Sequence, residues 1–120
     1  MSDCLFCGIV AGSIPSTKVY ETDRAYAFRD LHPAAPTHVL VVPKVHYADL
    51  AEMAASDPTY LGEVLGAATE VARQEGLTGG HRIIVNTGPD SGQTVFHLHV
   101  HVLGGRNLGL LAGQAQPPGR

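Results

Sequence analysis

The sequence lacks the features that mark several large classes of protein. Eight Lys and Arg stand against eleven Asp and Glu, a formal charge of −3, so no basic surplus is available to hold a nucleic acid backbone. The longest apolar run is about five residues, far below the roughly 20 needed to cross a bilayer. The first residues show no basic region followed by an apolar stretch, so we expect no signal peptide. These absences predict a cytoplasmic protein that binds neither membrane nor nucleic acid.

Cysteine is also scarce, with only Cys4 and Cys7, three positions apart. In a reducing compartment this spacing indicates half of a metal site or a redox pair rather than a structural disulfide. No second pair follows. The spacing alone therefore leaves a third interpretation open, in which two small apolar side chains are buried on a short helix.

What is present is the composition of one ordinary folded domain. The chain has 120 residues, of which 44% are apolar and 16% charged, and this excludes an intrinsically disordered protein. A chain of this length can bury a core without disulfide bonds. We therefore expect a single domain with its own hydrophobic core.

The order of apolar and turn-forming residues predicts an α+β fold. A short helix, capped by Ser2 and Asp3, runs through Ala11 to Gly12, and a brief helix is expected over 48–54. The main helix follows the cap Asp57 and ends at Gly76. Strands are predicted at 25–29, 38–42, 82–86 and 95–103, the last two forming an antiparallel hairpin across a loop of five to nine residues. The apolar stripe of the main helix consists of Leu61, Val64, Leu65, Ala68, Val71 and Ala72.

The most informative segment is the last predicted strand, which holds three alternating histidines. Because strand side chains alternate between faces, His97, His99 and His101 should share one face. Two chemistries fit such a set, a metal site or nucleophilic catalysis by the central imidazole. The upstream residues Gly88 and 91–94 offer backbone N–H groups, an amide and hydroxyls that suit phosphate oxygens, which favours the nucleophile.

The stretch 92–106, Gly-Gln-Thr-Val-Phe-His-Leu-His-Val-His-Val-Leu-Gly-Gly-Arg, closely resembles the histidine triad (HIT) family and, within it, the Hint branch. Segments 27–31, 35–44 and 84–88 also resemble family segments, in family order. The resemblance implies an α+β, HIT-like fold, with a five-stranded antiparallel sheet, one long helix and one or two short helices. It also implies a single HIT domain over 1–108, a C-terminal tail over 109–120, and a homodimer whose two sheets join.

The resemblance further implies a purine nucleotide hydrolase or nucleotidyl transferase that cleaves nucleoside phosphoramidates or acyl nucleotides. His99 would attack the α-phosphorus and form a covalent nucleotidyl-histidine, His101 would contact the phosphoryl oxygens or the leaving group, and His38 would assist proton handling. A neutral imidazole suits this role, because its usual pKa near ~6.5 leaves it largely nucleophilic at neutral pH. Nucleotide contacts are expected from Phe28, Asp30, Leu31, Asn86, Gln93 and Thr94, together with His99 and His101.

A metal site is the next implication of the resemblance. Many bacterial members carry a CxxC pair near the N-terminus, and the matching ligand set in this chain is Cys4, Cys7, His46 and His97. Such a closed set of two cysteines and two histidines predicts a structural Zn²⁺ site. No organic cofactor is expected. The remaining histidines, His32 and His81, are interpreted as surface residues.

Two other functions share these motifs. A dinucleoside polyphosphate hydrolase uses the same triad with a different leaving-group pocket, and a nucleotide-binding interaction module could carry the triad with incidental hydrolysis. Hint-branch relatives from animals end in a Trp-containing tail, whereas this chain has no Trp, so leaving-group preference is not transferable. The dimer has independent support from small residues on the main helix and from the apolar segment 82–85, although Gly62, Gly66 and Ala67 could instead pack the helix against its own sheet.

Overall fold

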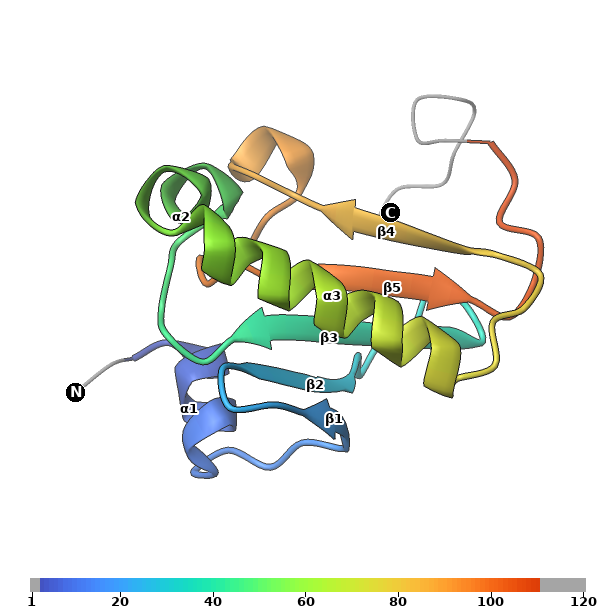
Figure 1. Ribbon diagram of the computed structural model, residues 1–120, viewed down its shortest axis with the longest axis horizontal. Coiled ribbons are helices and arrows are strands. Elements are labelled where there is room, and N and C mark those ends of the chain that lie inside the picture. The colour runs from blue at the N-terminus through green and yellow to red at the C-terminus, as the bar shows by residue number, and fades with distance from the viewer. Residues whose placement is uncertain (1–2, 111–120) are drawn as a thin grey trace.

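A computed structural model describes residues 3–110 and shows one antiparallel sheet of five strands in the order β1-β2-β3-β5-β4 (Figure 1). The strands are β1 (Lys18–Glu21), β2 (Ala25–Arg29), β3 (Thr37–Pro43), β4 (His81–Val85) and β5 (Val100–Gly104). One long helix and two short ones accompany the sheet, so the predicted α+β architecture is confirmed.

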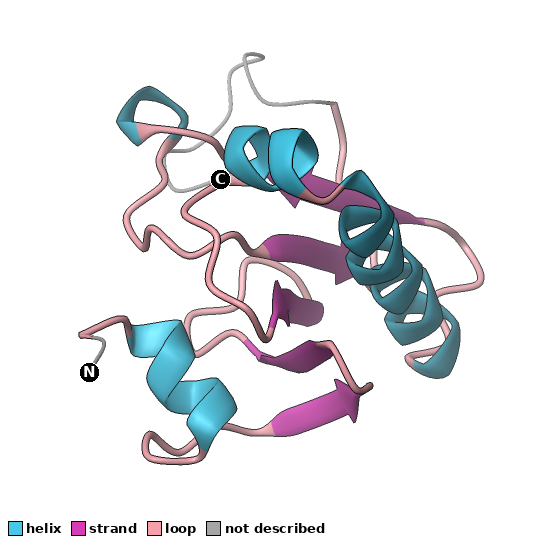
Figure 2. Cartoon of the chain, turned by 60° about the vertical axis from the view of Figure 1, so that its left-hand side comes forward, coloured by secondary structure: helices cyan, strands magenta, loops and turns pink. Residues whose placement is uncertain are grey.

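The sheet separates two layers of helices (Figure 2). The short helix α2 (Leu50–Ser56) and the long helix α3 (Pro58–Gln74) lie on one side, and α1 (Leu5–Ala11) lies on the other. Because side chains alternate between the two faces of β3, this strand contributes to the core on both sides of the sheet. Val39 and Val41 belong to the α3-side core, and Leu40 and Val42 pack with α1. All these positions are buried, and the functional residues gather on the α1 side.

The N-cap of helix α1 lies one residue later in the sequence than predicted. The side chain of Cys4 accepts the backbone N–H of Cys7 at 3.3 Å, so Cys4 rather than Asp3 is the N-cap, and Ser2 lies outside the described residues. The helix ends as predicted at Gly12, whose φ of 85° is a left-handed conformation that glycine adopts readily. The cap thus places a cysteine sulfur at the helix N-terminus.

The predicted long helix is confirmed with its cap. Asp57 accepts the backbone N–H of Tyr60 at 3.0 Å, and Pro58 occupies the first turn. The predicted apolar stripe is partly wrong, because Leu65 is 37% exposed and Tyr60 is buried instead. Helix α2 likewise begins at Leu50, after its own cap Asp49, rather than at position 48. The buried face of α3 comprises Tyr60, Val64, Ala67, Ala68, Val71 and Ala72.

The predicted strand over 95–103 is the main correction. Pairing of β5 with β4 is antiparallel as expected, but β5 starts only at Val100, opposite Val85, so the connection spans 86–99. At this point β4 has ended, and although β3 continues to Pro43, its pairing with β5 stops at Val41, opposite Val100. The backbone N–H of Leu98 donates instead to the carbonyl of Tyr47 at 2.7 Å. Of the three alternating histidines, only His101 lies in the strand.

Strand β1 is not predicted by the sequence pattern. Its four residues show no alternation of buried and exposed side chains, and its pairing with β2 has an irregular register near Lys18. No helix among residues 3–110 is long and apolar enough to span a membrane. Most of the predicted tail, 109–120, falls outside the described residues, so the domain boundary at 108 stays a prediction.

Candidate functional site

Two histidines from neighbouring strands form a hydrogen-bonded chain that fixes their proton positions. The backbone N–H of Ala34 donates to Nδ1 of His38 at 3.0 Å, so in the neutral ring the proton sits on Nε2. That Nε2 lies 2.9 Å from Nδ1 of His101 and donates to it. The proton of His101 is therefore on its own Nε2, which is buried and has no hydrogen-bond partner among residues 3–110. This hydrogen-bonded chain therefore ends in a buried N–H donor for which the described residues supply no acceptor.

Burial keeps these rings neutral. Desolvation, with the like charges of His99 and His38, lowers the pKa of His101 to about 4. Desolvation also lowers the pKa of His38, against the opposing effect of Asp30, whose carboxylate lies 3.5 Å from Nε2. Both rings are uncharged at neutral pH, as the hydrogen-bonded chain requires.

His99 is held with its other nitrogen available. Its Nδ1 lies 2.9 Å from the carbonyl oxygen of His97, and because a carbonyl only accepts, Nδ1 carries the proton and Nε2 the lone pair. The ring of Phe6 packs edge-on against His99 with centroids 5.1 Å apart, and burial lowers the pKa of His99. A neutral, oriented imidazole with a free Nε2 lone pair is the form needed for nucleophilic attack.

A cavity of about 680 Å³ on the α1 side of the sheet contains both His99 and His101. Helix α1 forms one wall, and the loops after β2 and β4 form the others. Leu31, 88% exposed, stands at its rim. Seven predicted nucleotide-binding residues line it, namely Phe28, Asp30, Leu31, Asn86, Thr94, His99 and His101.

Two predicted site residues lie behind this lining. His38 reaches the cavity only through His101. Gln93 is only 3% exposed. Its side-chain amide stabilises the loop before β5, because it accepts from the N–H of Gly88 at 2.8 Å and donates to the carbonyls of Ala48 and Val95. Gln93 thus shapes the loop that carries Thr94. Its expected contact with phosphate stays a prediction.

Several residues that line the cavity were not predicted from the sequence. Leu5, Phe6 and Ile9 of α1, with Ile14 just after it, supply apolar surface to the cavity, and Ser16 supplies a hydroxyl. The spacing of the α1 residues marks an apolar helix face, which is a local signal that was available. Which face of the sheet that helix covers depends on tertiary packing.

The cavity offers little positive charge to a ligand. Within 3–110, the only Lys or Arg in its lining is Arg29, whose guanidinium donates two hydrogen bonds to Glu75, at 2.8 and 3.0 Å. Asp30 and Asp90 contribute carboxylates to the same lining. Among the described residues, anion binding here therefore depends on neutral donors such as backbone N–H groups, Asn86, Thr94 and His101.

The predicted metal ligands come together beside this cavity, from three separate parts of the chain. The ligand atoms of Cys4, Cys7, His46 and His97 all lie within 4.8 Å of one another. Nδ1 of His97 is 3.3 Å from Sγ of Cys4, 3.5 Å from Sγ of Cys7 and 3.1 Å from Nδ1 of His46. Ligand atoms around a tetrahedral Zn²⁺ ion lie about 3.3–3.8 Å apart, given Zn–S and Zn–N lengths of about 2.3 and 2.0 Å.

The protonation of His97 also fits a metal ion. Its Nε2 lies 2.9 Å from the carbonyl oxygen of Pro43 and must donate to it, which leaves the lone pair on Nδ1 facing the two sulfurs. His97 is fully buried, whereas His46 is exposed and closes the cluster from outside. The four residues therefore suit a tetrahedral cation such as Zn²⁺.

A second group of possible ligands, Asp30, His38 and His101, does not suit a cation. A metal on Nε2 of His38 would force the proton onto Nδ1, where it would face the N–H of Ala34. Two donors would then oppose each other. The hydrogen-bonded chain described above uses the same atoms without this conflict.

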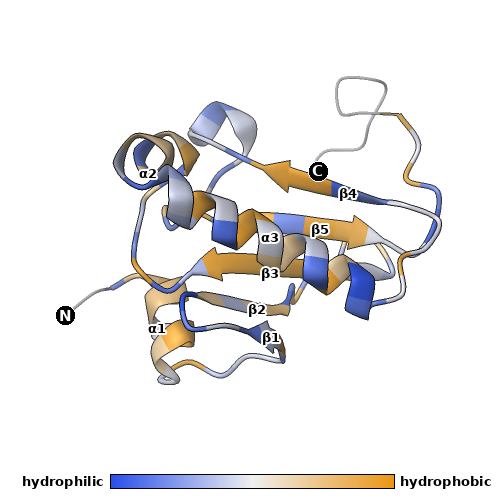
Figure 3. Cartoon of the chain, viewed as in Figure 1, coloured by the Kyte–Doolittle hydropathy of each residue, from blue (hydrophilic) through white to orange (hydrophobic). Residues whose placement is uncertain are grey.

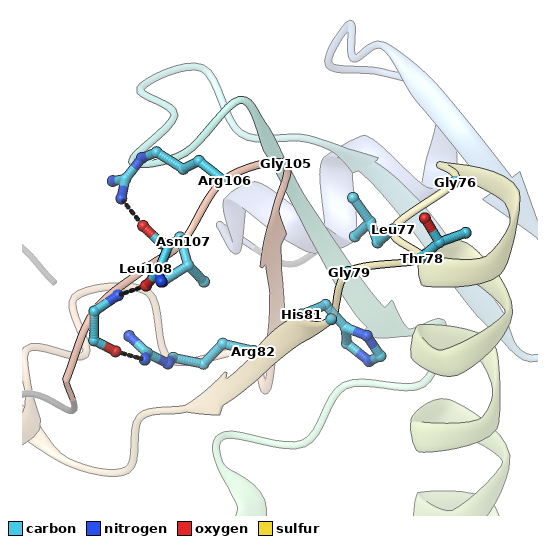
Figure 4. A pocket seen from close by; sticks show the side chains of 12 residues that line it. Gly76, Leu77, Thr78, Gly79, His81, Arg82, Gly105, Arg106, Asn107 and Leu108 are labelled. Atoms are coloured by element: carbon cyan, nitrogen blue, oxygen red, sulfur yellow. Dashed lines mark hydrogen bonds between the residues drawn. The ribbon is translucent and has the colours of Figure 1, made fainter.

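A further hollow lies at the opposite end of the sheet, between the turn after α3 and the segment that follows β5 (Figure 4). His81 borders this hollow, and Arg82 donates there to the carbonyl of Gly109 at 2.7 Å. No residue of the predicted site lines it. His32 and His81 are both exposed, as expected.

Comparisons with curated proteins identify close relatives. A HIT-like protein of Synechococcus elongatus is 49% identical over 117 residues, covering 98% of this chain and 97% of that protein. A 14 kDa zinc-binding protein of Zea mays is 46% identical, covering 89% of this chain and 85% of its own length. The adenylylsulfatase HINT1 of Arabidopsis thaliana is 43% identical, covering 89% and 74%.

Solved structures share the fold at similar identity. A HIT family hydrolase from Legionella pneumophila superimposes with a TM-score of 0.86 at 42% identity, covering 89% of this chain and 96% of that one. A histidine triad protein from Clostridium difficile gives a TM-score of 0.88 at 45% identity, covering 92% and 97%. The model of the HIT domain matches residues 11–108, most of the chain. With the triad geometry, these matches show that the chain belongs to the HIT domain family.

Proposed function

We propose that this protein hydrolyses nucleoside 5′-monophosphate derivatives, with purine phosphoramidates or acyl nucleotides as substrates, through a nucleotidyl-histidine on His99. The observation that carries the proposal is the hydrogen bond from Nδ1 of His99 to the carbonyl of His97, which leaves the Nε2 lone pair in the cavity. The relatives named as a hydrolase and an adenylylsulfatase support this class of reaction.

The chemistry proceeds in two displacements. Nε2 of His99 forms a bond to the α-phosphorus while the bond from phosphorus to the leaving group breaks, and the leaving group keeps the electron pair. Nε2–H of His101 donates to a phosphoryl oxygen or to the departing atom, and His38 supports it through the hydrogen bond to Nδ1. Water then attacks phosphorus while the bond from phosphorus to Nε2 of His99 breaks, so His99 recovers its lone pair and the nucleoside monophosphate leaves. The proton that the water loses restores Nε2–H of His101 in place of the proton passed to the departing atom.

The remaining lining residues divide between the two ends of a nucleotide. Asn86 and Thr94, with the loop braced by Gln93, are assigned to the phosphate, and Asp30 to the ribose hydroxyls. The base is assigned to the apolar slot between α1 and the sheet, which includes Phe28 and Leu31. Apolar walls with a few polar groups are the usual makeup of such a pocket.

The charge of the cavity favours this reaction over hydrolysis of dinucleoside polyphosphates. A polyphosphate leaving group carries several negative charges, yet the only guanidinium among the described lining residues is paired with Glu75. Asp90 adds a negative charge to the same wall. An uncharged or cationic leaving group meets no such repulsion. An interaction module with incidental hydrolysis would not require the nucleophilic form of His99.

We expect kcat/KM for adenosine 5′-phosphoramidate to exceed that for diadenosine tetraphosphate by at least about tenfold. Replacing Asp90 with lysine should narrow this ratio severalfold, because it adds a cation to the cavity wall. Asp23→Lys makes the same charge change in the exposed turn between β1 and β2 and should leave the ratio unchanged. Preference for the polyphosphate would contradict the proposal, and hydrolysis of neither substrate would favour the interaction module.

We further propose that Cys4, Cys7, His46 and His97 hold Zn²⁺. The donor set, its spacing and the Zea mays relative named as zinc-binding support this assignment. When bound, the ion would supply a rigid link among three chain segments, namely the start of α1, the loop after β3 and the segment leading into β5. Thiolate ligands persist in a reducing compartment, which favours a cytoplasmic location.

A homodimer is the last part of the proposal. Among residues 3–110, β4 is an edge strand with no partner on its outer side, and much of it is hydrophobic (Figure 3). Ile83 is 38% exposed on the α3 side of this strand, since it pairs with the core residue Val102. Glu63 of α3 binds Arg24 next to β2, so Glu63 marks the flank of the helix nearer β2. Leu65, two residues later in the helix, points to the opposite flank, which is the one nearer β4. Pairing of two β4 edges would cover this apolar strip.

We expect the protein to sediment at micromolar concentration with about twice its chain mass of 12.6 kDa. Ile83→Glu should shift the equilibrium toward monomer, because a carboxylate would be buried in the interface. Val45→Glu places the same charge at another exposed β-branched residue and should leave the mass unchanged. A wild-type mass equal to one chain at high concentration would rule out the dimer.

A further inference from the structure

The two cysteines of the proposed metal site also have the spacing of a redox pair, and the structure holds their sulfurs close together. Cys4 is the N-cap of α1, and the backbone N–H of Cys7 in the first turn donates to Sγ of Cys4 at 3.3 Å. The two sulfurs lie within 4.8 Å of each other. Since the chain contains only these two cysteines, a disulfide within one chain can form only between them.

The path of the backbone suits such a bond. The carbonyl of Cys4 accepts from the N–H of Gly8 at 3.1 Å, so the chain from Cys4 to Cys7 follows a helical turn. Residues three positions apart in such a turn have Cα atoms about 5 Å apart. A disulfide joins Cα atoms roughly 4.4–6.8 Å apart. The backbone therefore already meets this requirement, and rotation of the two side chains brings the sulfurs together.

A small oxidant can reach these sulfurs from solvent. Cys4 and Cys7 are half-buried, and His46, which faces Sγ of Cys7 at 3.3 Å, is exposed. Only His97, on the inner side of the cluster, is fully buried. Thiols that coordinate a metal ion are deprotonated, and the thiolate is the form of cysteine that reacts with oxidants. The cluster thus presents reactive sulfurs near the surface while its inner ligand extends toward the cavity.

We propose that Cys4 and Cys7 form an oxidation site, at which a peroxide joins the two thiolates in a disulfide, frees the metal ion and lowers turnover at His99; the inference rests on the proposed Zn²⁺ site and the proposed function. One thiolate attacks an oxygen of hydrogen peroxide, the O–O bond breaks, and a sulfenic acid and hydroxide form. The other thiolate attacks that sulfur, the S–O bond breaks, and a second hydroxide leaves. Protons from solvent convert both hydroxides to water, and the two electrons given up by the sulfurs reduce the peroxide.

Oxidation removes half of the metal ligands. Disulfide sulfurs are not thiolates, so only His46 and His97 remain, which is too few for the four-coordinate geometry of a structural Zn²⁺ site. The change reaches the proposed nucleophile through His97, whose carbonyl accepts from Nδ1 of His99 at 2.9 Å. Phe6, which lies between the two cysteines, packs edge-on against the rings of both His97 and His99. Both contacts predict that His99 is held less firmly in the oxidised protein.

The alternative role for the cluster is purely structural. Coordination and the two histidines would then shield the sulfurs, and peroxide would leave the metal ion in place. The two roles differ in the metal content and in the number of thiols after oxidation, and neither quantity depends on catalytic activity.

The test is to treat the full chain, loaded with zinc, with a small molar excess of hydrogen peroxide and to follow the metal with a chromogenic chelator. We expect release of about one Zn²⁺ per chain, loss of both titratable thiols and a mass lower by about 2 Da. The melting temperature should fall by roughly 10 °C, because a disulfide that closes so short a loop returns little stability. We expect kcat for adenosine 5′-phosphoramidate to fall about tenfold. Dithiothreitol with ZnCl₂ should reverse every change, because thiols reduce a disulfide but not a sulfinic or sulfonic acid.

The matched variant is Cys7→His, which keeps four nitrogen or sulfur ligands but has no second thiol to pair with Cys4. With its zinc content checked by elemental analysis, it should release the ion to peroxide at least about tenfold more slowly than wild type. Equally fast release from this variant would overturn the disulfide step. If the variant holds no zinc, the reversal by dithiothreitol in the wild-type protein decides, because only a disulfide is restored in this way.

The other outcomes separate the oxidation site from the proposals on which it rests. Retention of zinc and both thiols under peroxide overturns the inference and leaves the metal site and the hydrolase standing. Added oxygen mass that resists dithiothreitol, or a disulfide between two chains, also overturns it. Unchanged kcat in the oxidised protein would overturn the link to catalysis. A wild-type protein without zinc overturns the inference together with the proposed metal site. Absence of hydrolysis before oxidation contradicts the proposed function, while zinc release and mass still decide the oxidation site.

Discussion

Replacing His99 with alanine is expected to lower kcat for adenosine 5′-phosphoramidate by at least about 10³-fold while changing the Kd for adenosine 5′-monophosphate only severalfold. The reason is that, in the proposed reaction, His99 supplies the atom that bonds to phosphorus, whereas the apolar slot and the loop assigned to the phosphate would supply most of the affinity for the nucleotide. Single-turnover kinetics with the variant and isothermal calorimetry with the product would measure the two quantities separately.

The control is His81→Ala, because His81 is exposed at the far end of the sheet and lines only the other hollow. Its turnover should match wild type. His101→Asn should fall between the two, since Asn can still accept the hydrogen bond from His38 but presents no N–H in place of Nε2. Retention of more than a few per cent of activity in His99→Ala would exclude a covalent intermediate on this residue.

Removal of the proposed metal ion is expected to lower both the melting temperature and kcat. The double variant Cys4→Ser/Cys7→Ser should lose about one Zn²⁺ per chain by elemental analysis and melt at least roughly 10 °C lower, because the ion is bound only by the folded state. His97 contributes to both proposed sites, because its ring Nδ1 faces Sγ of Cys4 and its backbone carbonyl accepts from Nδ1 of His99, the proposed nucleophile. We therefore expect kcat, measured well below the lower melting temperature, to fall by about tenfold.

Phe6 gives a second reason for coupling between the two sites. It lies between the two cysteines in sequence and packs its ring edge-on against both His97 and His99, with centroids 6.0 and 5.1 Å apart. Wild-type protein dialysed against a chelator should show the same losses, and added ZnCl₂ should restore them. A metal-free protein with an unchanged melting temperature would contradict the assignment. Loss of all turnover with unchanged stability would indicate a catalytic metal instead.

Local sequence patterns determined most of the elements correctly, because each depends on residues close in sequence. Asp57 and Pro58 mark the start of α3 through a cap and a fixed φ, and Gly12 ends α1 through its left-handed backbone. The β-branched run ending in Pro43 predicts β3 in the same way. The composition of the triad and the CxxC spacing were likewise readable, and through the family resemblance they identified the residues that now lie in two adjacent sites.

The family resemblance assigned His97 to the metal site and His99 and His101 to catalysis, but only the tertiary structure shows how the backbone separates them. Strand pairing begins only at Val100, opposite Val41 of β3 and Val85 of β4. Before that point the backbone N–H of Leu98 donates to the carbonyl of Tyr47 instead of to a neighbouring strand. His97 contacts the other three possible metal ligands, and His99 and His101 line the cavity. Alternation within one segment does not predict this, because it depends on contacts with segments distant in sequence.

The sequence also did not determine which ring nitrogen of each histidine carries the proton. Nδ1 of His99 is fixed by a carbonyl two residues away, but Nε2 of His38 meets a ring 63 positions along the chain, and His97 meets Cys4 across 93 positions. Such contacts arise when strands and helices distant in sequence pack on one core, and periodicity within a single element does not predict them. The sequence thus determined which residues could do the chemistry, and packing decided which nitrogen of each ring faces the cavity, the cysteine sulfurs or a neighbouring carbonyl.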